Sequence, residues 1–141
     1  MKSSRFLLLP LILLCYSVLS QTRYDIVIDE IMADPSPQVG LPNTEWIELF
    51  NASTNPINLQ GWRIGDPTGL SGAMPNFILQ PDSFVIICAN SSAAEMSSFG
   101  TTLTVTAFPS LDNDGDEIFL KASNGFIFHA VSYSSSWYRM N

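Results

Sequence analysis

The feature of this sequence that most limits its fold is the shortness of its apolar runs. From Tyr24 onward, apolar residues either alternate with polar ones or form continuous blocks of five to seven, separated by clusters of Pro, Gly, Asn, Asp and Ser. No segment sustains the spacing of a helix. The candidate strands are residues 24–32, 45–51, 57–64, 84–89, 103–108, 117–122 and 126–133. Strands at this spacing predict a β-sandwich or a barrel.

Two connections have a clear local pattern. Ser123-Asn124-Gly125 separates the last two candidate strands, and Asn-Gly favours the positive backbone angles of a tight hairpin. Residues 93–96 predict a single helical turn, which Ser91 or Ser92 would cap and Gly100 would end. A single turn leaves the chain in the all-β class.

The aromatic residues of the strands are candidate core residues. Residues 45–51 alternate in a way that suits an antiparallel strand with one buried face, but the pattern leaves open which set faces inward. Trp46 and Trp62 both lie in candidate strands, where large aromatic side chains are mainly core material. We therefore expect both indoles to hold two sheets together.

The first twenty residues have the pattern of a secretory signal peptide. Lys2 and Arg5 precede the apolar run of residues 6–14, and small residues follow at the end, so we expect cleavage between Ser20 and Gln21. The apolar run is shorter than the roughly 20 residues of a membrane span, and no later run is longer. The sequence predicts a secreted or cell-surface protein whose domain covers residues 21–141, with no membrane span after cleavage.

The charge balance excludes some partners. The whole chain carries 13 acidic and 6 basic residues, and residues 1–20 contain two of the basic ones, so 4 basic and 13 acidic residues remain, a net charge of −9 over 121 residues. The remaining basic residues are scattered, at positions 23, 63, 121 and 139. Nucleic-acid binding relies on clustered Lys and Arg, so we expect no nucleic-acid partner.

Cysteine usage points to the kind of exported protein. Removal of residues 1–20 leaves Cys88 alone in an apolar run, where we expect a small buried side chain rather than a disulfide. Export without disulfides is more usual among bacterial modules than among small animal ectodomains. The composition therefore favours a bacterial origin.

Six segments in order resemble one known family. They are IDEIMADPSP (28–37), EWIELFN (45–51), LQGWRIGD (59–66), LQPDSFVII (79–87), PSLDNDGDEIFL (109–120) and SYSSSWY (132–138). Together they resemble the lamin tail domain family, in the type found in exported bacterial proteins. The resemblance implies an immunoglobulin-like antiparallel β-sandwich of about seven to eight strands and a module without catalysis, and so no cofactor.

The sequence departs from the family pattern at two places. His129 stands where relatives tend to carry an acidic residue, so that residue's role is not transferred to this chain. The chain also ends at Asn141, whereas the family continues into a Gly-rich turn and a last short strand. Either the sequence is a fragment of a longer protein, or the sheet ends at an exposed edge that is available for pairing.

Two groups of carboxylates raise the question of a cation site. Asp112, Asp114 and Asp116 alternate around a glycine, as oxygen ligands of calcium do, but the twelfth position of an EF-hand loop would fall on Ser123 rather than on glutamate. A polar turn explains the same residues. The second group, Asp25, Asp29, Glu30, Asp34, Glu45 and Glu48, could flank a cation between strands, although solvated strand faces explain it too.

Catalytic patterns are weak. His129 is the single histidine and lies in a candidate strand, and no serine occurs in a Gly-x-Ser-x-Gly turn. We assign no catalytic, cofactor-binding or metal-ligating residue. The sequence predicts a non-catalytic exported module for binding, adhesion or spacing at the cell surface, with an unidentified protein or polysaccharide partner. The alternatives are a calcium-binding adhesin or secreted metal-dependent hydrolase, and an accessory domain of a longer secreted enzyme.

Overall fold

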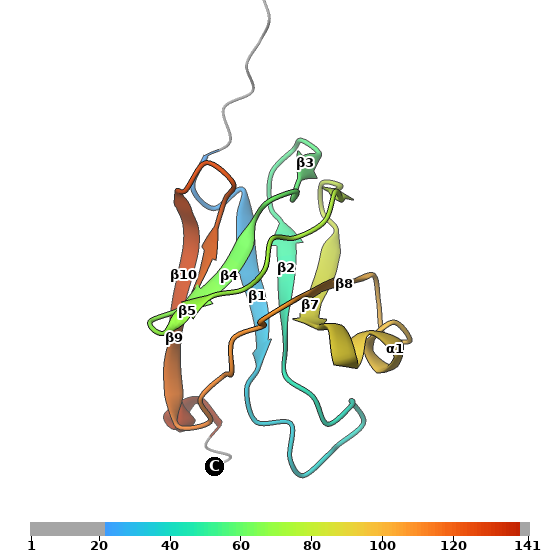
Figure 1. Cartoon of the computed structure of the whole chain (residues 1–141), viewed down its shortest axis with the longest axis vertical. Helices are drawn as coiled ribbons and strands as arrows, with labels where there is room; N and C mark the ends of the chain where they lie inside the picture. The colour runs from blue at the N-terminus through green and yellow to red at the C-terminus, as the bar shows by residue number, and fades with distance from the viewer. Residues whose placement is uncertain (1–21, 139–141) are drawn as a thin grey trace, which may run out of the picture.

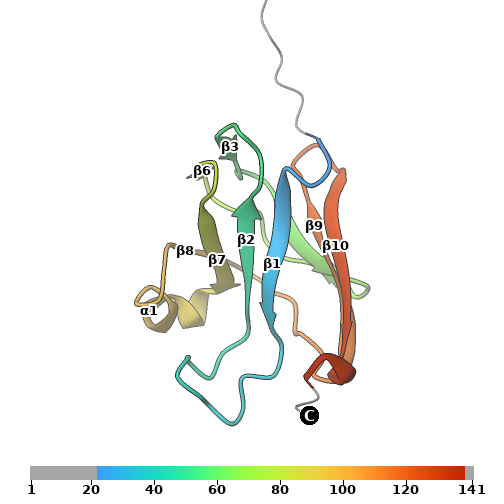
Figure 2. The same ribbon diagram turned by 180° about the vertical axis from the view of Figure 1, so that it is seen from behind.

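The chain folds into two β-sheets that face each other. The computed structural model describes residues 22–138. The first sheet has the order β1 (Ile26–Met32), β2 (Trp46–Asn51), β7 (Phe84–Ala89), β8 (Thr102–Val105). The second has the order β10 (Ile127–Ser134), β9 (Gly115–Lys121), β4 (Arg63–Asp66), β5 (Gly69–Leu70), and β3 (Ile57–Asn58) pairs separately with β6 (Ile78–Leu79). Figures 1 and 2 show the two layers from opposite sides, and they confirm the expected immunoglobulin-like β-sandwich.

Several expectations concern residues outside this range. The expected leader, its cleavage site between Ser20 and Gln21, and any strand after Tyr138 lie outside the described residues. Within residues 22–138, no helix is long and apolar enough to cross a membrane.

The strongest strand and turn patterns are confirmed. β7 occupies residues 84–89, as expected, and β9 and β10 form the expected hairpin. At its tip Gly125 has a φ of +91°, and the backbone N–H of Phe126 donates to the side-chain oxygen of Asn124 at 3.1 Å. Asparagine and glycine therefore provide the turn chemistry that the sequence predicts.

The single strand expected over residues 57–64 is wrong. The chain turns in the middle of this segment, where Gly61 has a φ of +81° and the N–H of Trp62 donates to the carbonyl of Leu59 at 3.0 Å. β3 therefore pairs with β6, while β4 joins the second sheet. Glycine permits this conformation because it has no Cβ.

One strand pair departs from the antiparallel pattern. β7 and β8 run parallel, whereas every other described pair is antiparallel. A parallel pair needs a crossover of about a dozen residues. Here residues 90–101 form the crossover, and it contains η1 (Asn90–Ser92) and the expected helical turn, α1 (Ala93–Met96).

The expected N-cap position of α1 is confirmed at Ser92, but the side-chain capping bond and the expected end of the helix are not. No side-chain capping bond forms at Ser92, because its hydroxyl group is paired with that of Thr44 at 2.5 Å. The helix ends at Met96, with Ser97 as its C-cap, rather than at Gly100. A hydroxyl group that is engaged in a contact between loops is not available as a cap.

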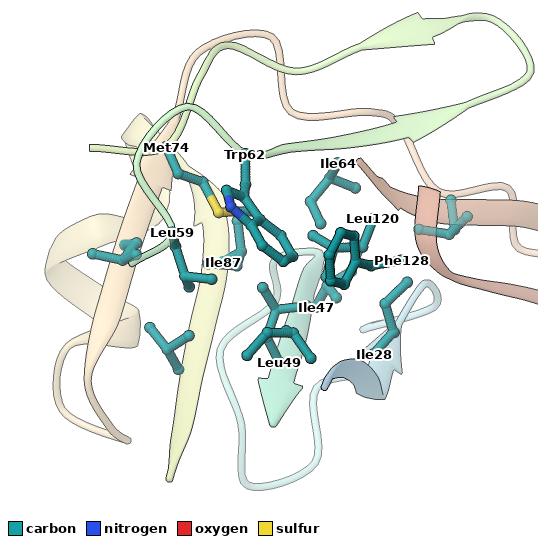
Figure 3. Packing of buried hydrophobic residues seen from close by; sticks show 14 of the residues in the cluster. Ile28, Ile47, Leu49, Leu59, Trp62, Ile64, Met74, Ile87, Leu120 and Phe128 are labelled. Atoms are coloured by element: carbon teal, nitrogen blue, oxygen red, sulfur yellow. The ribbon is translucent and has the colours of Figure 1, made fainter. Parts of the chain in front are cut away.

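Trp62 lies in the main core, as expected. Its side chain is 1% exposed, and its ring centroid lies 4.6 Å from that of Phe128. Figure 3 shows the Trp62 indole among Phe128 and Met74 and near Ile47 and Ile87 of the first sheet. This indole therefore packs between the two sheets.

Trp46 is buried, but it does not hold the two sheets together. Ile47 and Leu49 of β2 point into the main core, so the alternating side chain of Trp46 lies on the other face of the same sheet. There it packs in a separate cluster with Ile86, Cys88 and Met96, the last of which comes from α1. The expectation for Cys88 is confirmed: it is buried, and burial raises the pKa of its thiol.

Candidate functional site

Figures 1 and 2 show the end of the sandwich where β1 ends and β2 and β9 begin. Residues at this end line three hollows. We name two of them, by the side chains that line them, the acidic pocket and the aromatic groove. The third hollow, of about 500 Å³, lies between residues 38–43 and the segment that follows α1. Loops at the ends of a β-sandwich commonly carry binding functions.

The acidic pocket has a volume of about 650 Å³. Its walls come from the start of β2, the β4–β5 turn and the loop that leads into β9. They consist of Glu45, Asp66, Pro67, Thr68, Ser110, Leu111, Asp112, Asn113 and Asp116. Four carboxylates thus line one hollow, and no basic side chain lines it.

Asp66 organises the β4–β5 turn. Its Oδ1 accepts hydrogen bonds from the backbone N–H and the hydroxyl group of Thr68 and from the N–H of Gly69, each at 2.7 Å. Burial by itself raises the pKa of Asp66, but these hydrogen bonds outweigh it and lower the pKa below the ordinary 3.8. The Asp66 carboxylate is therefore stabilised by donors of its own chain.

Glu45 also holds two segments of the chain together, through one hydrogen bond to its carboxylate. The backbone N–H of Leu111 donates to its Oε2 at 3.2 Å, which attaches the start of β2 to the loop before β9. Burial raises the pKa of Glu45 above 4.5, and the hydrogen bond opposes that rise only in part. The acidic pocket therefore contains one carboxylate of lowered pKa and one of raised pKa.

The candidate calcium ligands form a turn. Asp112 and Asp116 line the acidic pocket, whereas Asp114 is not part of its wall. Contacts to main-chain oxygens hold the loop: the Tyr133 hydroxyl donates to the carbonyl of Asp112 at 2.9 Å, and the Ser135 N–H donates to that of Asp114 at 2.9 Å. Among residues 22–138, no three His, Cys, Asp or Glu side chains are grouped so that they could hold a metal ion.

The aromatic groove lies along the seam between the two sheets. It has a volume of about 420 Å³, and the edge strands β1 and β10 provide most of its walls. Its walls consist of Ile28, Asp29, Glu30, Ile31, Met32, Leu41, Trp46, Val131, Tyr133 and Trp137. The groove is mostly apolar and aromatic, with carboxylates as its only charged side chains.

His129 closes the seam above the groove. The N–H of Ile28 in β1 donates to Nδ1 of His129 in β10 at 2.8 Å, and the Tyr24 ring contacts the imidazole edge-on at 5.7 Å. Nδ1 can accept this bond only while it carries no proton. Burial lowers the pKa of His129, which favours that state. His129 therefore joins the edges of the two sheets.

Both strands at the seam are irregular. The register of β1 against β2 shifts between Ile28 and Glu30, and that of β10 against β9 shifts between Ile127 and His129. Bulges of this kind bend edge strands and redirect side chains. The shift in β1 falls at Asp29, whose side chain lines the groove.

The carboxylates beside the groove repel one another. Glu30 lies directly opposite Glu48 in the β1–β2 pairing. The pKa of Glu48 is raised by burial first, and then by the charges of Glu30 and Asp29. Like charges opposite each other destabilise a sheet. These three members of the second acidic group are therefore close together, whereas Glu45 lies in the acidic pocket.

Two indoles complete the groove. Trp137, in η2 (Ser135–Tyr138), is 63% exposed. Trp46 is 5% exposed, and its Nε1 is a buried donor without a hydrogen-bond partner. Residues 132–138 (SYSSSWY) resemble a family motif, but nothing in their pattern distinguishes an exposed tryptophan from a buried one. The groove was missed because it joins β1 to η2, which are separated by about a hundred residues.

Comparison with known proteins gives one clear result. The family model of the Lamin Tail Domain matches residues 20–135, which is most of the chain. No curated protein matches the chain.

Proposed function

The chain belongs to the lamin tail domain family. We propose that it is an exported, non-catalytic module that acts in binding, adhesion or spacing at a bacterial cell surface. We propose that its aromatic groove is the surface that contacts the partner. Membership of the family supports an immunoglobulin-like module without catalysis. The family does not determine which residues bind a partner, because one fold hosts many functions.

The exposure of Trp137 is the observation that carries this proposal. A tryptophan that is 63% exposed leaves a large apolar surface in water, and it lines a hollow whose other apolar walls include Met32, Leu41 and Val131. Tryptophan and tyrosine are enriched where proteins bind their partners. Concave sites with mostly apolar walls and a few polar groups are the usual form of a binding site.

Export is supported by residues 1–20, with their basic start and short apolar run. The test is the intact mass of the protein that is recovered from the medium or surface of cells making the full chain. We expect a species that begins at Gln21. A mass that includes residues 1–20 would contradict cleavage at this site.

The binding role is tested with Trp137→Ala. We expect the purified protein, labelled with a fluorophore, to bind to cells of its own source, and the variant to lose most of that binding. Phe99→Ala is the matched control, because Phe99 is an aromatic residue that is 50% exposed at the third hollow of the same end. Equal binding by wild type and Trp137→Ala would place the binding surface elsewhere.

The calcium-binding and metal-dependent alternatives have less support. They depend on Asp112, Asp114 and Asp116, but Asp114 is not in the wall of the acidic pocket and Oδ1 of Asp116 accepts the N–H of Glu117 at 2.7 Å. These residues together make the turn that begins β9. No contact among the described residues favours the accessory-domain alternative over the main proposal.

A further inference from the structure

We propose that the aromatic groove takes a cationic side chain, a lysine or an arginine, from an exposed segment of a partner protein. This inference rests on the proposed function, because it requires the groove to be a binding site. It adds the chemistry of the group that is bound.

The first support is a group of carboxylates beside the groove, whose wall contains no basic side chain among the described residues. Asp29 and Glu30 are exposed at the rim of the groove, and Glu48 lies close enough for their charges to raise its pKa. The basic residues described, Arg23, Arg63 and Lys121, line none of the three hollows. Carboxylates whose mutual repulsion is not relieved inside the chain would be stabilised by a cation from outside.

The second support is the kind of apolar surface beside those carboxylates. Trp137 is largely exposed, and Tyr133 lies in the same wall. A lysine or arginine side chain has an apolar stem, and its cationic end is attracted to the face of an aromatic ring. The indole surface of the groove can therefore pack against the apolar stem, and the carboxylates at the rim can pair with the cationic end. A hydrocarbon chain could pack against the indole but would leave the carboxylates without a partner.

The polar atoms of the groove fit a cation better than a sugar. The side-chain acceptors at the rim are the carboxylates of Asp29 and Glu30, and no Asn, Gln, Lys or Arg side chain lines the groove. The Tyr133 hydroxyl donates to the carbonyl of Asp112. Sugar hydroxyl groups both donate and accept, whereas ammonium and guanidinium groups only donate. The groove therefore favours a protein partner over a polysaccharide.

The surroundings of the groove would also favour the approach of a basic partner. Glu45, Asp112 and Asp116 line the acidic pocket at the same end, and Glu95 lines the third hollow. These carboxylates give this end of the sandwich a negative field that attracts cations. Complementary charge of this kind raises association rates and rejects acidic competitors.

The test titrates the protein with four short peptides that differ at one central position. That position holds lysine, arginine, norleucine or glutamate, and the other positions are Gly and Ala with blocked ends. The readout is the indole N–H signal that Trp137→Ala removes, because Trp137 is 63% exposed whereas Trp46 and Trp62 are buried. We expect the lysine and arginine peptides to bind at least about fivefold more tightly than the norleucine peptide, and the glutamate peptide not to bind.

Two double variants separate a specific site from general attraction. Asp29→Asn with Glu30→Gln removes two charges at the groove, and Asp112→Asn with Asp116→Asn removes two at the acidic pocket. We expect the first pair to weaken lysine-peptide binding about fivefold or more and the second to leave it nearly unchanged. Equal weakening by both pairs would overturn the proposal, because it would show attraction by net charge alone.

The remaining outcomes distinguish this inference from the proposed function. If the norleucine peptide binds as tightly as the lysine peptide and Trp137→Ala weakens both, the groove is a binding site but not one for cations. If the peptides leave Trp137 unperturbed while the cell-binding assay still depends on Trp137, the cation inference is wrong and the proposed function stands. If neither assay depends on Trp137, both are wrong.

Discussion

Asp66 and Glu48 lie in opposite sheets of the sandwich, and both are partly or fully withdrawn from solvent, but the chain treats their charges in different ways. Asp66 accepts three hydrogen bonds from the turn that follows it, and its pKa is lowered. Glu48 is placed opposite Glu30, and its pKa is raised. One carboxylate is satisfied by its own chain, whereas the other leaves a surplus of negative charge on the surface.

The difference between these two carboxylates indicates which end-loop surface is more suited to bind a partner. The acidic pocket contains more carboxylates, but Asp66 and Glu45 use theirs to hold turns and loops together. Beside the aromatic groove, burial and then the charges of Glu30 and Asp29 raise the pKa of Glu48. Unrelieved charge beside exposed aromatic surface marks a binding site better than a count of acidic residues does.

The largest effect expected from this comparison is the loss of the Asp66 carboxylate. Asp66→Ala removes an acceptor that is shared by three donors, so we expect the free energy of unfolding to fall by about 2 kcal/mol. Urea unfolding at neutral pH measures it. Asp34→Ala is the matched control at an exposed aspartate, and we expect a change within about 0.5 kcal/mol there. An equal effect in both variants would show that the turn does not depend on the Asp66 charge.

Acid should weaken the protein through Asp66. Because its pKa is lower in the folded state than the ordinary 3.8, the folded chain binds this proton less readily than the unfolded chain. Its contribution to stability is therefore present above about pH 4 and is lost as the pH falls through the folded pKa. We expect the acid loss of stability to be shallower in Asp66→Asn, by thermal melts between pH 2 and pH 5.

At the seam between the sheets, Nδ1 of His129 accepts a hydrogen bond from a strand of the opposite sheet. His129→Leu would leave the N–H of Ile28 without its partner, and we expect a loss of about 1 kcal/mol at pH 8. The pKa of His129 is lowered, so its contribution is present above its ordinary pKa of 6.5 and declines as the pH falls through the folded value. His129→Gln, which keeps an acceptor, should lose this pH dependence but keep more stability than His129→Leu.

Much of the sandwich was predictable because its signals are local. The alternation in β2, the apolar run of β7 and the Asn124-Gly125 turn each depend on residues that are adjacent in sequence. The division of residues 57–64 was not predictable in this way, because Gly61 lies inside an otherwise strand-like pattern. The short strands β5 and β6 are two residues each, which is too short for a period to be recognised.

The site was less predictable because it depends on which face each residue occupies. The sequence grouped Glu30 with Glu48, but their direct pairing follows from the β1–β2 register, which a bulge shifts. Trp46 was assigned to the core between the sheets, although Ile47 and Leu49 occupy that side of β2. A shift of one position in a strand exchanges its faces, so the sequence alone could not distinguish these arrangements.

A smaller effect of opposite sign is expected at Glu48. Glu48→Gln removes a charge that repels Glu30 and Asp29, so we expect a gain of about 0.5 kcal/mol at pH 7. Because its pKa is raised above 4.5 in the folded state, its contribution is most favourable below that value and is lost as the pH rises through the folded pKa. Glu95→Gln, at an exposed helix position, is the control. A loss of stability in Glu48→Gln would mean that the ionised form makes a favourable contact.

The smallest effect is expected from calcium, and it tests whether the acidic pocket is as internally satisfied as Asp66 suggests. A site that binds only the folded form raises the melting temperature in proportion to the logarithm of free ligand over its dissociation constant. No three carboxylates among residues 22–138 are grouped for a metal ion, so we expect millimolar calcium and a chelator to give melting temperatures within about one degree of each other. Asp112→Asn with Asp116→Asn should respond in the same way as wild type. A larger rise in wild type that this pair abolishes would restore the calcium alternative, and it would show that these two carboxylates, unlike Asp66, are free to serve a ligand.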